Sequence, residues 1–304
     1  MQDLARTCEA VAATTKKTEK IRLVAAYFTA HPTDAPRAAV FLSGRAFPAW
    51  EERTLQVGGA ALWRALGEIS AKSEAQLSLT YRKYGDMGSA AAEVLASVAG
   101  KDSSLSLENL STVFDEMART SAASAKFGLL RGLLGRATAL EAKYIIKIIG
   151  GDLRIGLRES LVEEAIALAF DEGLGDVQRA NMLLGDIGQT LRLAAERALG
   201  QARMRLFHPL GFMLASPAAD AEEALSYFEH AAVEDKYDGI RAQAHCGGKD
   251  DPRVRIFSRT LDEIAESFPE LPPALRAFPD SLILDGEILG WDPAERRALP
   301  FSEL

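Results

Sequence analysis

The sequence contains little cysteine or histidine, and this scarcity limits the sites that it can build. Among 304 residues there are two cysteines, Cys8 and Cys246, and four histidines. The cysteines are far apart in sequence, and no Cys-x-x-Cys pair or Cys/His cluster occurs. A structural zinc site and a disulfide framework are therefore not expected, and a reducing compartment is the expected location.

Long apolar runs are also missing. Stretches such as residues 161–170 are interrupted by charge and are shorter than the roughly 20 residues that a helix needs to span a bilayer. The N-terminus places Asp3 and Arg6 ahead of any apolar run, unlike a secretory signal peptide. Neither a membrane protein nor a secreted one is expected, and the 48% hydrophobic and 26% charged content is typical of a soluble folded protein.

Basic charge is not in excess. The formal net charge is −8, and it is uneven, because residues 1–205 carry a net +2 whereas residues 206–304 carry −10. This total excludes a protein coated in basic charge, but local patches decide nucleic-acid binding, not the sum. The charge alone therefore neither predicts nor excludes a nucleic-acid partner.

The first half of the sequence has the periodicity of helices. The length suits two domains, and apolar residues such as Leu4, Cys8 and Val11 recur at helical spacing. After two helices within the first 30 residues, further helices are predicted at about 59–70, 90–99, 107–122, 127–134, 140–149, 160–169 and 176–199. The sequence predicts an all-α N-terminal domain that the long last helix closes.

The second half has a different pattern. Residues 206–217 contain two prolines and a glycine, which predicts an interdomain crossing. Beyond it the period becomes two, with two strands expected within 230–244, one at 253–259 and two short ones around Asp-Gly within 281–291. A short helix is expected at 261–268. The sequence therefore predicts a multidomain protein whose second domain is α+β with an antiparallel-leaning sheet.

Two glycine-containing turns stand ahead of helical runs in the first half. Residues 85–88 read Gly-Asp-Met-Gly, and residues 151–156 read Gly-Asp-Leu-Arg-Ile-Gly. Such a turn exposes backbone N–H groups at a helix start, which suits a phosphate. The alternative, which the frequency of helix caps favours, is an ordinary cap formed by the aspartate.

One segment of the second half carries residues suited to nucleophilic chemistry. Residues 234–241 read Glu-Asp-Lys-Tyr-Asp-Gly-Ile-Arg. In an extended strand Glu234 and Lys236 point to the same side, next to an Asp-Gly turn. A lysine attacks only after losing its proton, which desolvation or nearby positive charge promotes. Arg241, Arg255 and Arg259 could supply such charge, along with a bound metal ion. Taken alone, the segment also fits an inert surface lysine.

Three motifs in a fixed order resemble those of the ATP-dependent DNA ligases, which belong to the covalent nucleotidyltransferases. The motifs are EDKYDGIRAQAH at 234–245, IFSR at 256–259 and LDGEIL at 284–289. They resemble, in that order, the family's nucleotide-binding motif with its flanks, the following strand motif and the third motif. A lysine, an arginine five residues on, a second arginine and then Asp-Gly-Glu make a specific combination.

The helical half resembles the same family. Its DNA-binding domain precedes the catalytic core in archaeal, eukaryotic and some bacterial ligases, and the matching segments are FLSGR at 41–45, TYRKYGDMGSAAAEVLA at 80–96 and EAKYIIKIIGGDLRIGLRES at 141–160. HPLGFMLASP at 208–217 resembles the family's interdomain segment. The resemblance thus covers nearly the whole chain.

The resemblance implies roles for individual residues. Lys236 would attack the α-phosphate of ATP, expel pyrophosphate and hold AMP through a phosphoramidate bond. The AMP would pass to a 5′-phosphate at a nick, and the 3′-hydroxyl would displace it. Glu234 would accept a hydrogen bond from adenine, Arg241 and Arg259 would contact ribose and phosphate or the DNA 5′-phosphate, and Glu287 would hold the ribose hydroxyl or Mg²⁺. Arginines and Mg²⁺ suit phosphoryl transfer because it depends on positioning and charge neutralisation.

For the helical half, the resemblance implies a domain that encircles nicked duplex DNA. The candidates for phosphate contact are Gly85, Gly88, Arg154 and Gly156. Phosphate contacts would make binding fall steeply with salt, whatever the base sequence. The expected partners are nicked double-stranded DNA and ATP with Mg²⁺. A monomer in the cytoplasm, associated with the nucleoid and of a prokaryotic form, is expected.

The resemblance also sets the expected domains. They are a DNA-binding domain at 1–205, a crossing at 206–217 and the first part of an adenylation domain at 218–304. In the family the chain continues with the rest of that domain and an OB-fold domain, which supply further catalytic residues. This sequence contains neither, so we expect the 304-residue chain to seal nicks poorly or not at all.

Two alternatives stay open. An RNA ligase or an mRNA-capping guanylyltransferase would share the lysine chemistry, although the helical half argues against it. A non-catalytic DNA-binding remnant of a ligase would bind nicked duplex without forming a lysine adduct. His245 and Cys246 are expected to have no catalytic part, because His245 has no visible metal partner in the sequence.

Overall fold

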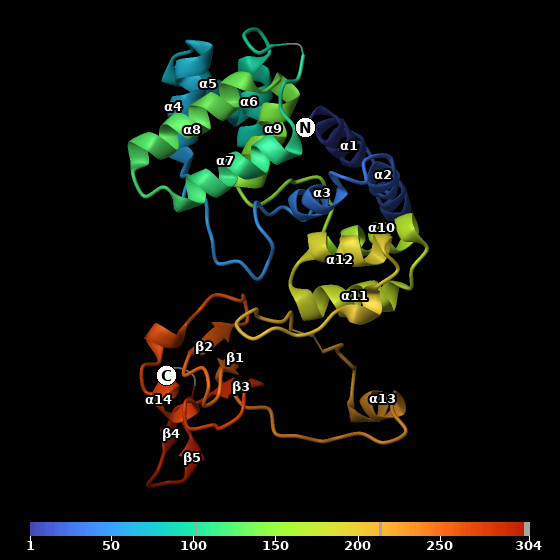
Figure 1. The fold of residues 1–304 in the computed structure, drawn as a ribbon, viewed down its shortest axis with the longest axis vertical. Helices are drawn as coiled ribbons and strands as arrows, with labels where there is room; N and C mark the ends of the chain where they lie inside the picture. Colours follow the sequence, from blue (N-terminus) through green and yellow to red (C-terminus); the bar gives the residue numbers. More distant parts are fainter. Residues whose placement is uncertain (101, 213–214, 301–304) are drawn as a thin grey trace. The chain divides into compact units, whose positions relative to one another are not determined.

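Helical periodicity in the first part of the chain produces a helical fold. The structure, a computed structural model, describes residues 1–100, 102–212 and 215–300. Contacts between residues divide the chain into two units, Met1–Arg203 and Met204–Leu304 (Figure 1). The first unit is all-α, as the sequence predicts.

The helices of the first unit follow one another through short connections and one longer loop at 43–58. They are α1 (Gln2–Ala12), α2 (Lys17–Ala30), α3 (Ala35–Leu42), α4 (Gly59–Ser70), α5 (Glu74–Tyr84), α6 (Met87–Leu95), α7 (Leu107–Arg119), α8 (Ala123–Arg136), α9 (Ala139–Ile149), α10 (Glu159–Phe170), α11 (Leu174–Leu184), α12 (Ile187–Ala195) and the 3-10 helix η1 (Leu199–Gln201).

Helices from the two ends of this unit lie side by side. α2 packs against α10 and α3 against α12, while α6 packs against α9 and α4 against α8 in a second group (Figure 1). Buried side chains from both groups form one continuous core, in which Phe28, Phe41, Phe114 and Tyr144 are fully enclosed. Burial of large side chains of this kind stabilises the fold by about 1.5–3 kcal/mol each.

Two pairs of helices are joined by the same glycine–aspartate junction. α5 ends at Gly85 and α11 at Gly185, with left-handed φ angles of 62° and 60°. The next residue, Asp86 or Asp186, caps the following helix by accepting backbone N–H bonds. The single helix predicted over 176–199 is therefore wrong, because this junction separates α11 from α12. The sequence reading also missed α5.

A second glycine in each junction lets another part of the chain approach closely. A Cβ added at Gly88 of α6 would lie 2.5 Å from the carbonyl oxygen of Lys143 in α9. A Cβ added at Gly188 of α12 would lie 2.6 Å from the carbonyl oxygen of Pro36 in α3. Both distances are below what real Cβ atoms adopt, so each pair of helices packs at a spacing that only glycine permits.

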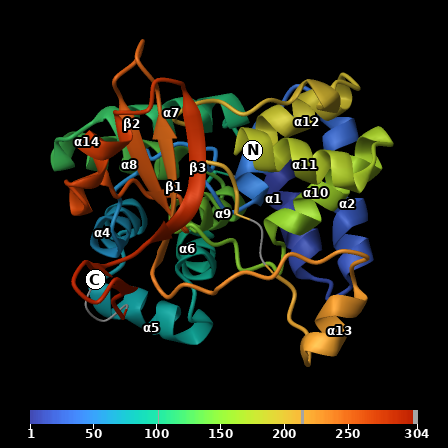
Figure 2. The same cartoon turned by 90° about the horizontal axis from the view of Figure 1, so that it is seen from below.

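The second unit contains a small antiparallel sheet with short helices. Its elements are α13 (Ala221–Ser226), β1 (Ile240–Cys246), β2 (Val254–Ser258), the 3-10 helix η2 (Ala265–Ser267), α14 (Leu271–Leu275), β3 (Leu282–Ile288), β4 (Trp291–Asp292) and β5 (Arg297–Ala298). β1 lies between β2 and β3, antiparallel to both, as Figure 2 shows, and β4 pairs with β5. The predicted α+β class with an antiparallel sheet is confirmed.

The strand bounds differ from the sequence reading at three places. Residues 231–238 form no strand, so only one of the two strands expected within 230–244 exists. β3 runs straight through Asp285-Gly286, because its whole length pairs with β1 and this pairing overrides the turn preference of Asp-Gly. In place of the helix expected at 261–268, the chain forms a turn at Ser258–Asp262, then η2 and later α14.

Among the described residues, no helix has both the length and the apolar character needed to cross a membrane. The crossing predicted at 206–217 includes residues 213–214, which lie outside the described residues.

The close approach at Gly88 predicts a large effect of a small substitution. Gly88→Ala should lower the free energy of unfolding by about 1–3 kcal/mol, because the added methyl group meets backbone that cannot swing away. Urea unfolding followed by far-ultraviolet circular dichroism would measure this.

Gly128→Ala is the matched control. Gly128 lies within α8 with no atom within 4 Å of an added Cβ. Alanine there should raise the free energy of unfolding by about 0.5–1 kcal/mol through helix propensity. Equal effects of the two substitutions would contradict the close packing of α6 on α9.

Candidate functional site

The lysine of the predicted nucleotide-binding motif lies on an exposed segment. Residues 231–238 have no regular secondary structure, and the side chains of Glu234 and Lys236 are both exposed. The expectation that these two residues share one side of a strand is therefore wrong, since β1 begins only at Ile240. Functional side chains often lie on irregular segments of this kind, beside a rigid scaffold.

A glycine contact ties this segment to the strand that carries Asp-Gly-Glu. The backbone N–H of Gly239 donates to Glu287 Oε1 at 3.3 Å. A Cβ at Gly239 would overlap the carbonyl oxygen of Ile288, so only glycine allows the chain to lie this close to the end of β3. The structure thus brings the first and third motifs together, with Lys236 three residues before the contact.

The register of β1 and β3 sets the neighbours of Arg241. Arg241 stands directly opposite Glu287, and residues paired in this way point to the same face of the sheet. Its guanidinium donates to Asp285 through Nη2 at 2.8 Å and Nε at 3.2 Å, and lies 4.5 Å from the centre of the Phe212 ring. The hydrogen bonds with Asp285 raise the pKa of Arg241, so its charge is permanent.

Two arginines of the sheet are balanced by carboxylates. Arg241 pairs with Asp285, and Arg255 pairs with Glu263 at 2.8 Å. These two arginines, expected from the sequence as aids to lysine deprotonation, are therefore committed to ion pairs.

Arg259 lies at the same end of the sheet as the other candidates. It is exposed and directly follows Ser258, which pairs with Ala242 of β1. The paired register ends at Ser258, and Arg259 begins the turn that follows β2, next to the end of β1 that carries Arg241. The structure therefore gathers Arg241, Arg259, Glu287 and the lysine segment at one end of the sheet.

In the helical unit, three turns that carry the ligase-like motifs meet. Arg154 Nη1 donates to the carbonyl oxygen of Gly85 at 3.0 Å. Gly44 lies so close to the same turn that an added Cβ would be 3.3 Å from the Gly151 oxygen. Buried Lys20 donates to the carbonyl oxygen of Ile155 at 2.5 Å. The turn at 151–156 thus lies at the centre of what we call the turn cluster, formed by residues 43–45, 85–86 and 151–156.

The four residues predicted to contact phosphate have different surroundings. Gly85, Arg154 and Gly156 are exposed, and the last two have left-handed φ angles of 52° and 62°. Gly88 is buried, and its N–H donates to Asp86 Oδ1 at 3.2 Å. At Gly88 the structure therefore favours the cap over a direct phosphate contact.

The charged group beneath the first turn is itself buried. Asp86 pairs with Lys147 at 2.8 Å, and the Lys147 side chain is only 6% exposed. Burial alone would raise the pKa of Asp86, but the hydrogen bonds from Lys147 and Ser89 outweigh it and lower that pKa. The Asp86 cap is thus ionised and fixed.

The turn at 151–156 opens no helix, because α10 begins at Glu159, beyond Gly156.

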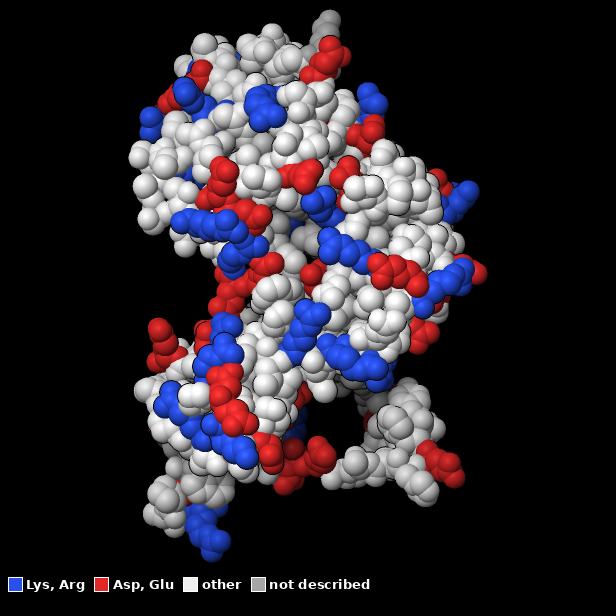
Figure 3. Space-filling model, viewed as in Figure 1, with Lys and Arg blue, Asp and Glu red and all other residues white. Residues whose placement is uncertain are grey.

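Charge on the visible face of the molecule is mixed. Figure 3 shows blue Lys and Arg side chains interspersed with red Asp and Glu side chains. No continuous basic patch is seen among the described residues of this face.

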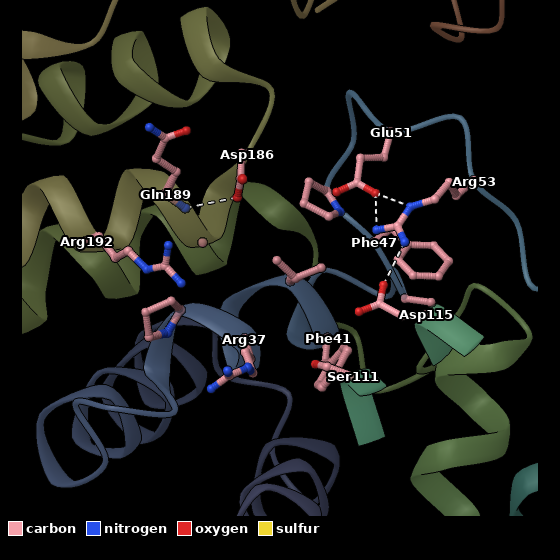
Figure 4. Close-up of a pocket in the computed structure, with 15 residues that line it drawn as sticks. Arg37, Phe41, Phe47, Glu51, Arg53, Ser111, Asp115, Asp186, Gln189 and Arg192 are labelled. Carbon is pink, nitrogen blue, oxygen red and sulfur yellow. Dashed lines mark hydrogen bonds and ion pairs between the residues drawn. The ribbon is translucent and has the colours of Figure 1, made fainter. Parts of the chain in front are cut away.

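A cavity of about 320 Å³ lies among α3, α7, α12 and the loop before α4 (Figure 4). Arg53 extends into it, donates to Asp115 at 2.6 Å and to Glu51, and lies 4.3 Å from the Phe47 ring centre. Arg37 pairs with Glu108 at 3.6 Å. The ion pair of Arg53 with Asp115 ties the loop to α7. Since the charges of Arg53 and Arg37 are compensated, we assign the cavity no ligand.

The sequence reading missed several residues that shape the nucleotide end of the sheet. Asp285 holds Arg241, Phe212 covers it, and Gln243 and His245 occupy the same face of β1. The alternation of Asp285 and Glu287 in one strand was the available signal, since it places both on one face. No group of three or more His, Cys, Asp or Glu suited to a metal occurs among the described residues.

Comparisons with known proteins match both parts of the chain. The family profile described as DNA ligase N terminus matches residues 1–167, and the one described as ATP dependent DNA ligase domain matches residues 212–304. Both descriptions agree with the motifs gathered at the sheet end and in the turn cluster.

Curated relatives match along nearly the whole chain. A probable DNA ligase of Koribacter versatilis is 58% identical over 100% of this chain and 52% of its own length. A probable DNA ligase of Opitutus terrae is 37% identical over 97% of this chain and 35% of its own. A DNA ligase of Archaeoglobus fulgidus is 32% identical over 87% of this chain and 49% of its own. This chain spans about half the length of the relatives or less, and it belongs to the ATP-dependent DNA ligase family.

Proposed function

We propose that this chain carries the DNA-binding and lysine-adenylylation functions of a ligase that seals nicks in duplex DNA at the expense of ATP. The observation that carries the proposal is the hydrogen bond from Gly239 N–H to Glu287 Oε1, which joins the lysine segment to the Asp-Gly-Glu strand. Family membership and the position of Arg241 opposite Glu287 support it. Both matched profiles describe DNA ligase regions, so an RNA ligase or a capping guanylyltransferase is not favoured.

The proposed first step takes place on Lys236. After its ammonium group loses a proton, Nζ attacks the α-phosphorus of ATP, an N–P bond forms, and the bond to the pyrophosphate oxygen breaks. Exposed Glu234 accepts a hydrogen bond from the adenine amino group. Arg241 and Arg259 hold ribose and phosphate oxygens, since both lie at the same end of the sheet.

In the later steps the AMP moves from Lys236 to the 5′-phosphate of a nick. The neighbouring 3′-hydroxyl then attacks that phosphate, the phosphodiester bond forms, and AMP leaves. Arg241 and Arg259 are also suited to the DNA 5′-phosphate, because guanidinium groups bind phosphate oxygens in pairs.

Glu287 fits a role in holding Mg²⁺. It is exposed, it lies beside the lysine segment, and one of its oxygens already accepts from Gly239 N–H. Mg²⁺ is commonly held by one or two carboxylates together with substrate phosphates and water, so one carboxylate here is a suitable protein ligand. When bound, the ion would neutralise charge on the phosphates.

We also propose the division of labour along the chain. Residues 1–205 bind nicked duplex DNA, residues 206–217 cross between domains, and residues 218–304 belong to the adenylation domain. Within the first of these, Gly85, Arg154 and Gly156 of the turn cluster contact backbone phosphates. A monomeric state, a cytoplasmic location with the nucleoid and a prokaryotic origin stay predictions from the sequence.

The adenylylation step has a direct test. Incubation of the chain with ATP and Mg²⁺ should add one AMP to the intact mass, and Lys236→Ala should abolish the gain because no other amine occupies that position. Mass spectrometry of the intact protein measures both. Lys249→Ala, at another exposed lysine of the same unit, should still gain one AMP.

The absence of any adduct on the folded chain would contradict self-adenylylation by these residues and would favour the non-catalytic DNA-binding alternative. An adduct that persists in Lys236→Ala would assign the chemistry to a different residue.

The DNA-binding role of the turn cluster has a test of its own. Arg154→Gln keeps a donor for the Gly85 oxygen but removes the charge, so it should weaken binding to nicked duplex at every base sequence. The slope of log affinity against log salt should fall in magnitude by about one. Fluorescence anisotropy across a salt series measures this.

Arg6→Ala is the control, because Arg6 is exposed on α1 and pairs with Asp3 in the same helix. It should leave the affinity and the slope unchanged. A normal salt slope in Arg154→Gln would remove Arg154 from the phosphate contacts.

A further inference from the structure

Two buried polar side chains of β1 have no part in the proposed chemistry. Gln243 is 3% exposed and His245 is 0% exposed. Both point to the face of the sheet that carries Arg241, because alternate residues of a strand share a face. Polar groups buried in this way cost free energy unless hydrogen bonds satisfy them, so their partners indicate what they do.

Their partners are backbone groups of an irregular segment, residues 207–212. The N–H of Phe207 donates to His245 Nδ1 at 2.8 Å, and the N–H of Leu210 donates to Gln243 Oε1 at 2.8 Å. Phe212, at the end of the segment, lies against the Arg241 guanidinium. Segment 207–212 therefore runs along β1 in the opposite direction, with a contact at every second residue of the strand.

The network admits one arrangement of protons. A backbone N–H can only donate, so His245 Nδ1 must accept and carries no proton. His245 Nε2 lies 2.8 Å from Gln243 Oε1, which can only accept, so Nε2 carries the proton and donates. Gln243 Oε1 thus receives two hydrogen bonds, and its amide orientation is fixed.

The surroundings keep His245 neutral. Burial, together with the charges of Arg255 and His208, lowers its pKa to about 4. Arg253 lies over the Phe207 ring, 4.3 Å from its centre, and adds a positive group on the same side. Two carboxylates balance these arginines, since Glu263 is paired with Arg255 and Asp251 with Arg253. The acceptor at Nδ1 is therefore present at every pH at which ATP chemistry would proceed.

We propose that Gln243 and His245 are positioning residues, which fasten segment 207–212 to the sheet and thereby hold Phe212 against Arg241. Arg241 is then fixed by Asp285 at its edge and by the aromatic ring at its face. Its orientation toward the nucleotide is set before ATP binds, which reduces the entropy lost on binding. The effect on nucleotide binding rests on the proposed function, whereas the fastening of segment 207–212 to the sheet does not.

The fastening is tested by spectroscopy on the full chain. Long-range ¹H–¹⁵N spectra should show His245 as the Nε2–H tautomer and still neutral at pH 5, whereas exposed His230 serves as the reference ring. The amides of Phe207 and Leu210 should be protected from hydrogen exchange. An Nδ1–H tautomer, or titration of His245 near 6.5, would overturn the proposal.

Substitutions separate fastening from general stability. His245→Leu and Gln243→Leu remove the acceptors, and each should lower the protection of Phe207 and Leu210 by about tenfold or more and weaken the Phe212–Arg241 contacts seen in nuclear Overhauser spectra. His245→Asn places an oxygen near the position of Nδ1 and should restore the protection of Phe207. Ile256→Val, a buried change on the opposite face of the sheet, should leave both amides as they are.

Activity then tests the consequence for the nucleotide. If the wild-type chain forms the adduct, the two leucine variants should need about tenfold more ATP for half-maximal rate, with a smaller change in the maximal rate. His245→Asn should recover most of the loss.

Unchanged amide protection in folded leucine variants overturns the fastening. Lost protection with an unchanged ATP requirement overturns the positioning of Arg241. A wild-type chain that forms no adduct contradicts the proposed function alone, because the spectra still decide the fastening.

Discussion

The antiparallel register of β1 against β3 is the constraint on which the candidate nucleotide site depends. It places Arg241 opposite Glu287 and brings Gly239 against the end of β3. A slip of one residue would turn Arg241 toward the apolar face that holds Cys246 and Ile256, and would bury its charge without a partner. The residues that would bind ATP thus also specify the pairing of the strands that carry them.

An exposed lysine beside a paired sheet suits the successive steps of the proposed reaction. In the proposed function Lys236 would reach the nucleotide and later present AMP to a nick, whereas the arginines would only hold phosphate oxygens. The segment at 231–238 is exposed and has no regular secondary structure, and Glu287 accepts a hydrogen bond from Gly239 N–H just after it. Arg241 therefore lies on a paired strand, where its charge is held in place, whereas Lys236 lies on an irregular segment.

The sequence predicts those features that depend on local pattern or on ordered motifs. The helical first half, the antiparallel second half and Lys236 with its flanking motifs all follow from residues close together in the chain. The break between α11 and α12 was missed because Gly185 and Asp186 sit inside a continuous apolar pattern, although the same Gly-Asp pair at 85–86 was interpreted as a possible cap. The strand expected at 231–238 failed for the opposite reason, since its alternating pattern has no partner strand to pair with.

Charge decides how such a chain can bind DNA at all. Residues 206–304 carry a net −10, so the overall charge of that half would repel the negatively charged backbone of a duplex. The helical half is close to neutral, and its acids and bases are interspersed (Figure 3). In the proposed function, binding would then depend on cations and backbone groups at fixed positions, such as those of the turn cluster. Asp86, held ionised by Lys147, and Lys20, held on Ile155, fix the turns from beneath and leave Arg154 exposed above them.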